Sequence, residues 1–224
     1  WNGALEDEFY DLKLTLDSAR AVTDKPMVIA GYMNYDAAQQ HTSQSPGAFN
    51  EPGILLADAA IFANGGWHIE LGDGLNMLSN EYFPRQALVM SPSLQAKLLG
   101  YYNFAVAYEN LLRDGVTNGN KRIDFDLGGS TFTSYNASAG TVWKIAKTRS
   151  GLGCATAYDI AHLINLTGTT STIWRDLDGS SPVPVVIENK PVRLYYDGAW
   201  AGSTVWYASP DANGGRAAQV TDYQ

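Results

Sequence analysis

The spacing of apolar residues changes near residue 118, and this change restricts the folds open to the chain. Upstream, the apolar run at 27–33 and the short alternating run at 67–71 predict two strands, and Asn50-Glu51-Pro52 and Ser91-Pro92 predict two helix starts. Another amphipathic helix is predicted from apolar residues that recur every three or four positions: Leu5, Phe9, Leu12, Leu16, Ala19 and Val22. The order helix, strand, helix, strand, helix predicts parallel strands joined by crossover helices.

Downstream of residue 118 the pattern becomes that of an antiparallel β-sandwich. The stretches KRIDFDL, TVWKIAK, AHLINL, VVIENKPVRLYYD and STVWYAS alternate in β-forming residues between clusters rich in Gly, Asn, Asp and Pro. Charge divides at the same place, because residues 1–118 carry 6 basic and 14 acidic side chains and residues 119–224 carry 9 of each. We therefore predict two domains, 1–118 (α/β) and 119–224 (all-β).

Composition excludes several classes of partner. The net charge of −8 disfavours nucleic acid, and no apolar run approaches the roughly 20 residues of a membrane span. Three scattered His and one Cys provide no zinc-binding spacing, and no acidic loop has the pattern of a calcium site. No metal or other cofactor is expected. Six Trp, 13 Tyr and 7 Phe instead suit stacking on flat, uncharged ligands such as sugar rings.

Two parallel strands are too few for a stable sheet. Their outer edges would expose unpaired backbone groups and apolar faces. The chain is therefore expected to come from a longer α/β domain, cut just after a strand.

Several sequence blocks resemble glycoside hydrolase family 66, which contains dextranases and cycloisomaltooligosaccharide glucanotransferases. GYMNYD (31–36), LADAAIFANGGWHIELGDG (56–74), MLSNEYFP (77–84) and YENLLRDG (108–115) resemble the last part of its (β/α)8 barrel. YDIAHLINL (158–166), WRDLDG (174–179) and VWYASPD (205–211) resemble its C-terminal β-sandwich. The resemblance implies the last two βα units of a (β/α)8 TIM barrel followed by an antiparallel β-sandwich.

The resemblance also implies a retaining, endo-acting hydrolase of α-1,6-glucosidic bonds in dextran, with an Asp nucleophile and a Glu acid/base. In the family, the Glu lies two residues before a Trp at a strand end, and Trp1 resembles that Trp. Both catalytic carboxylates are then expected upstream of Trp1, in an N-terminal part of the same barrel that could be another chain. The expected ligands are dextran and isomaltooligosaccharides, and the expected location is extracellular.

Two alternatives stay open beside the dextranase. The cyclising glucanotransferases carry a binding module after the strand that matches HIELGD, whereas here residues 72–76 lead directly to MLSNEYFP. This difference favours the dextranase branch over a cycloisomaltooligosaccharide glucanotransferase. A non-catalytic glucan-binding fragment is the other alternative.

Candidate substrate-binding residues follow the two predicted strands, because active sites of such barrels form at the carboxyl ends of the strands. They are Tyr32, Asn34, Tyr35, His68, Glu70, Asp73, Asn80, Glu81 and Tyr82. Period-two alternation places His68 and Glu70 on one face. Each aromatic residue in the set could instead be a packing residue.

Glu70 has three open roles, because a carboxylate between Ile69 and Leu71 cannot stay buried without a partner. It could pair with His68 or an Arg, contact substrate, or serve as a fallback catalytic carboxylate. A solvated role is expected for His41 and a structural one for His162. The DLDG and DGAW stretches are predicted to be hairpin turns.

Overall fold

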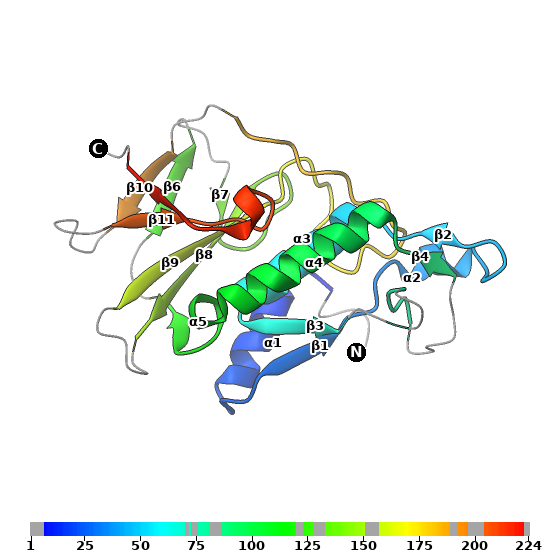
Figure 1. Cartoon of the computed structure of the whole chain (residues 1–224), viewed down its shortest axis with the longest axis horizontal. Helices are drawn as coiled ribbons and strands as arrows, with labels where there is room; N and C mark the ends of the chain where they lie inside the picture. The colour runs from blue at the N-terminus through cyan, green and yellow to red at the C-terminus, as the bar shows by residue number, and fades with distance from the viewer. Residues whose placement is uncertain are drawn as a thin grey trace.

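The computed structural model describes residues 7–69, 72, 76–80, 87–119, 123–127, 133–150, 157–188, 192–196 and 204–221. Its first half alternates helices and short strands (Figure 1). In order they are α1 (Phe9–Arg20), β1 (Met27–Ala30), α2 (Tyr35–Gln39), β2 (Gly47–Ala48), α3 (Glu51–Ala63), β3 (Gly66–Ile69), β4 (Leu88–Val89), α4 (Pro92–Ala107) and α5 (Glu109–Leu112). The predicted succession of long helices and strands is confirmed.

Local signals explain where these helices begin and end. The side chain of Asn50 accepts a hydrogen bond from Gly53 N, and that of Ser91 accepts one from Leu94 N, each with a proline in the following turn. Helix α1 ends at Arg20, so Val22 is exposed and does not extend its apolar face as predicted. The predicted helix from Pro92 onward is interrupted at Tyr108, where the backbone leaves helical geometry.

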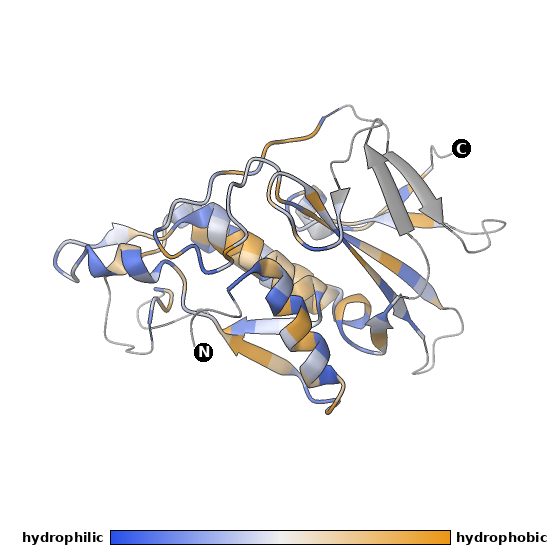
Figure 2. Ribbon diagram, turned by 180° about the vertical axis from the view of Figure 1, so that it is seen from behind, coloured by the Kyte–Doolittle hydropathy of each residue, from blue (hydrophilic) through white to orange (hydrophobic). Residues whose placement is uncertain are grey.

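Strands β1 and β3 form the predicted parallel pair, in which Ile29 lies opposite His68 and Ala30 opposite Ile69. One face of the pair packs on α3, a helix buried along most of its length. On the other face Val28 is 49% exposed and Ile69 is 48% exposed. Figure 2 shows β1 as hydrophobic along its whole length. Among the described residues, this apolar face therefore has no covering layer.

The second half has strands in each predicted stretch, although residues 185–188 form none, and β7 and β12 were not predicted. Strand β5, also not predicted, lies at the end of the first half. The strands are β5 (Val116–Asn118), β6 (Ile123–Leu127), β7 (Thr133–Ser134), β8 (Val142–Arg149), β9 (Tyr158–Asn165), β10 (Val192–Tyr196), β11 (Val205–Tyr207) and β12 (Ala218–Val220). Antiparallel pairing joins β8 to β9, β5 to β8, β6 to β10 and β11 to β12, whereas β7 runs parallel to β8.

A continuous core joins the two halves. It includes Leu12 of α1, Ile61 of α3 and Leu98 of α4, together with Trp143 of β8 and Ile164 of β9. Strand β5 ends before the predicted boundary at residue 118/119 but pairs with β8 of the second half. The halves consequently share a buried surface, in addition to the chain connection between them.

Candidate functional site

The loops after β1 and β3 lie at the same edge of the sheet, because the two strands are parallel. They are joined directly, since Met33 N donates to Leu78 O across 3.3 Å. This edge gathers all the predicted substrate-binding residues that the structure describes. In barrels built from such βα units, this edge carries the active site.

Tyr32 and Tyr35 have side chains that solvent can reach. Tyr32 directly follows Gly31 and is half-buried, and Tyr35 begins α2 with its side chain 38% exposed. A phenol ring in this setting combines an apolar face with a hydroxyl that can hydrogen-bond. The assignment of both residues to ligand contact stays a prediction.

Asn34 and His68 are placed differently from the prediction, because both are buried with internal partners. His68 Nδ1 lies 2.8 Å from Asp58 Oδ1, and His68 Nε2 lies 3.1 Å from Gly31 O. The alternation of β3 turns His68 toward α3, where Asp58 sits ten residues earlier in the chain. A β-carbon at Gly31 would collide with His68 Nε2, so glycine is required for this contact.

Five predicted substrate-binding residues remain. The structure describes one of them and leaves four outside its described ranges. Asn80 is buried, as are Met77 and Leu78 earlier in the same segment. Glu70, Asp73, Glu81 and Tyr82 lie outside the described residues, as does Trp1. The assignment of these five positions stays a prediction.

Residues 172–181, here called the docking segment, were missed as part of this site. Asn34 N donates to Arg175 O, and the amides of Asp36 and Ala37 both donate to Leu177 O. The segment also contacts the start of α1, where Phe9 N donates to Thr172 O, and the residues just before it, where Trp174 N donates to Asp7 O. The prediction that DLDG is a hairpin turn is wrong, because residues 176–179 connect no strands and pack on the loop after β1. DGAW lies outside the described residues.

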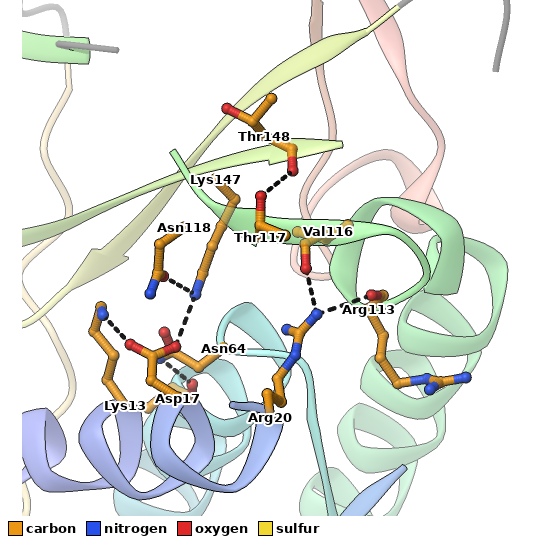
Figure 3. Close-up of polar contacts among 11 residues, drawn as sticks. Lys13, Asp17, Arg20, Asn64, Arg113, Val116, Thr117, Asn118, Lys147 and Thr148 are labelled. Carbon is orange, nitrogen blue, oxygen red and sulfur yellow. Dashed lines mark hydrogen bonds and ion pairs between the residues drawn. The ribbon is translucent and has the colours of Figure 1, made fainter. Parts of the chain in front are cut away.

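A cluster of charged residues joins α1 to β5 and β8 away from the strand ends (Figure 3). Lys147 is almost fully buried, donates to Asn118 Oδ1 at 2.8 Å and lies 3.6 Å from Asp17 Oδ1. Burial lowers the pKa of Lys147 to about 8, against the attraction of Asp17. Burial alone would raise the pKa of Asp17, but hydrogen bonding from Lys13 and the charge of Lys147 lower it.

The adjoining strand holds His162, whose predicted structural position is confirmed only in part. Its Nε2 atom is buried with no hydrogen-bond partner among the described residues. Burial and the nearby Lys147 charge lower its pKa to about 4, so the ring is neutral at pH 7. Within the described ranges, no three His, Cys, Asp or Glu side chains lie close enough to hold a metal ion.

Comparison with known proteins decides the family. Residues 1–223 match glycosyl hydrolase family 66. The chain belongs to this family. The resemblance found in the sequence blocks is thereby confirmed.

Relatives of this family 66 chain include enzymes of both kinds. It is 35% identical over 222 residues to a cycloisomaltooligosaccharide glucanotransferase of Niallia circulans, covering 98% of this chain and 21% of that protein. It is 30% identical over 240 residues to a dextranase of Streptococcus salivarius, covering 93% of this chain and 28% of that protein. The chain thus spans between a fifth and a third of these relatives.

A solved family structure shares the fold. It is a Paenibacillus cycloisomaltooligosaccharide glucanotransferase in complex with cycloisomaltoheptaose, with a TM-score of 0.79 and 23% identity. The match covers 98% of this chain and 47% of the other. At this identity the comparison establishes the fold. In the described part of the chain, no helix has the length and apolar character needed to cross a bilayer.

Proposed function

We propose that this chain is the C-terminal part of a secreted, retaining, endo-acting hydrolase of α-1,6-glucan, of the dextranase type. The observation that carries the proposal is the family match over residues 1–223, together with a dextranase among the relatives. Residues 1–118 would supply the last two βα units of a (β/α)8 barrel, and residues 119–224 its C-terminal β-sandwich.

The exposed apolar face of the sheet supports the barrel assignment. Val28 and Ile69 lie on the face turned away from α3, about half exposed to solvent. In a closed barrel, side chains on this face fill the interior in layers contributed by neighbouring strands. The upstream strands of a longer protein would cover it.

The proposed reaction uses two carboxylates from that upstream part. The Asp attacks the anomeric carbon while the Glu protonates the departing glycosidic oxygen, which gives a covalent glucosyl-enzyme and a shortened glucan. The Glu, now a carboxylate, then removes a proton from water, which attacks the anomeric carbon and releases the Asp. The present chain would supply substrate contacts and be inactive alone.

A cycloisomaltooligosaccharide glucanotransferase is the second candidate, favoured by the 35% identity to such an enzyme. In that reaction the 6-hydroxyl at the far end of the bound glucan replaces water as the acceptor. The direct passage from residue 72 to MLSNEYFP, with no inserted module, favours hydrolysis.

The products of the full-length protein distinguish these candidates. We expect dextran to be cut to linear isomaltooligosaccharides of retained anomeric configuration, with starch as an α-1,4-linked control left intact. Cyclic products would establish the transferase. Glucan binding without any cleavage would establish the non-catalytic alternative, and cleavage of starch alone would refute the proposal.

Tyr32 provides a mutational test of the substrate contact. In the full-length protein, Tyr32→Ala should cost about 2 to 3 kcal/mol in kcat/KM for dextran, because the ring face would be lost. Tyr32→Phe removes only the hydroxyl and should cost about 1 kcal/mol. Tyr207→Ala, at an exposed tyrosine of β11, is the matched control. Unchanged kcat/KM in Tyr32→Ala would make Tyr32 a packing residue.

A further inference from the structure

The docking segment holds the loop after β1 through its backbone. Arg175 O accepts from Asn34 N at 3.0 Å, and Leu177 O accepts from Asp36 N at 2.8 Å and from Ala37 N at 3.0 Å. These amides belong to the start of α2, where a free helix would leave its N–H groups without partners. The second half of the chain thus completes the hydrogen bonding of the loop that carries Tyr32 and Tyr35.

Side chains reinforce this contact through Asn34 and Asp176. Both are buried, and both have left-handed backbone conformations, with φ of 53° and 43°. Asn34 Nδ2 donates to Asp176 Oδ2 at 3.1 Å and to Asp176 O at 2.6 Å. Asp176 Oδ1 accepts from the amides of Ser180 and Ser181, both at 2.9 Å. The carboxylate therefore shapes its own turn and binds the loop at the same time.

The carboxylate of Asp176 packs closely on the first turn of α3. A β-carbon at Gly53 would lie 2.9 Å from Asp176 Cγ, so only glycine allows the approach. Asn50 N donates to Asn34 Oδ1 at 2.9 Å, and Asn50 Nδ2 donates to Gly179 O at 2.8 Å. The negative charge also lies at the positive end of the α3 dipole. The loop after β1, α3 and the docking segment consequently form one hydrogen-bonded unit.

We infer that Asp176 is a positioning residue for the substrate-contacting loop. Acting through Asn34, it fixes the backbone of the loop that contains Tyr32 and Tyr35. The side chains of these two residues then contact the glucan in a fixed orientation. Arg175 supports it, because its Nε atom donates to Tyr32 O at 3.1 Å. The inference rests on the proposed function, and it gives the second half of the chain a part in substrate binding.

The test uses Asp176→Asn in the full-length protein. This change keeps the side-chain size but places an NH2 group or a weaker acceptor against Asn34 Nδ2. We expect kcat/KM for dextran to fall about tenfold, mainly through a higher KM, because substrate contacts would be misplaced. Amide hydrogen exchange at residues 34, 36 and 37 should become faster. Asp178→Asn is the matched control, since this exposed carboxylate accepts a hydrogen bond from Ser180 Oγ within its own turn.

A double-mutant cycle with Asn34→Gly separates positioning from general stability. Asn34→Gly removes the amide that donates to both Asp176 Oδ2 and Asp176 O, and glycine tolerates the left-handed backbone of position 34. If Asp176 acts through Asn34, Asp176→Asn should cost little further kcat/KM in the Asn34→Gly background. Arg175→Met, which removes one hydrogen bond from a half-buried side chain, is a milder variant should Asp176→Asn fail to fold. It should raise KM in the same direction.

Each outcome has a defined meaning. Wild-type kcat/KM in Asp176→Asn, or additive losses in the double variant, would overturn the inference. Absence of α-1,6-glucan cleavage by the wild-type protein would instead overturn the proposed function. In that case the hydrogen exchange of residues 34–37 still decides whether Asp176 orders the loop.

Discussion

Trp174→Ala is expected to lower the free energy of unfolding of this chain by about 3 to 5 kcal/mol. Trp174 is 1% exposed, and its Cζ3 atom would lie 3.0 Å from a β-carbon at Gly31, beneath the loop after β1. Its backbone amide donates to Asp7 O at 2.9 Å, so the residue also holds the segment just before α1. Truncation would leave a large cavity between the docking segment and the first half, which the surrounding backbone cannot close.

Urea unfolding followed by circular dichroism measures this loss. Trp206→Ala is the matched control, because the Trp206 side chain is 60% exposed and its removal should change stability by no more than about 0.5 kcal/mol. Equal effects of the two substitutions would show that Trp174 does not join the halves. A weakly destabilised variant with faster exchange only at residues 172–181 would limit its role to local order.

The sequence was sufficient for features set by neighbours along the chain. The α3 cap depends on Asn50 and Gly53, three residues apart, and the stop after Ala63 precedes a glycine with φ of 79°. The parallel pairing of β1 and β3 followed from the order of elements, because a helix between two strands returns the chain to the same edge. These signals act within one βα unit and do not depend on the rest of the fold.

The docking segment was not predictable because its partners are distant in the chain. Asn34 and Asp176 are 142 positions apart, and most bonds of the segment use backbone atoms, which carry no residue-type signal. The residue types were only a weak clue to this contact. Asn and Asp favour the left-handed conformation, but they adopt it in ordinary turns as well.

His68 shows a second limit of sequence reasoning. Period-two alternation correctly separates the two faces of β3, but it does not say which face meets the helices. The decisive fact is the position of Asp58 on the buried face of α3. The available sequence signal was Asp58, an acidic residue within an apolar helix and ten residues before His68. Such a residue needs a polar partner if it is buried.

The stability of the chain is expected to fall by about 3 kcal/mol as the pH is lowered from 6.5 to 4, through His162 alone. The ring is buried in the native state, with a pKa of about 4, against an ordinary value of 6.5 when unfolded. Between these values the unfolded chain binds more protons than the native one, so acid favours unfolding. Above pH 6.5 both states are neutral and this contribution is constant.

His162→Leu should remove most of that acid-side slope, as measured by urea unfolding at several pH values. His41→Gln, at an exposed histidine, is the control and should leave the slope unchanged. Lys147→Met should also reduce the slope, because the Lys147 charge contributes to the low pKa of His162. An unchanged slope in His162→Leu would show that other groups, such as the carboxylates, account for the acid sensitivity.

The same measurement at high pH tests Lys147 itself. Its pKa is about 8 in the native state and 10.5 when unfolded, so the native state releases its proton first. From pH 8 to 10.5 the unfolded state binds more protons, and this residue should make stability rise with pH by about 3 kcal/mol. In Lys147→Met this rise should be lost, while the exposed Lys25→Met should keep it. A rise that survives in Lys147→Met would mean that Asp17 and Asn118 hold the ammonium with an ordinary pKa.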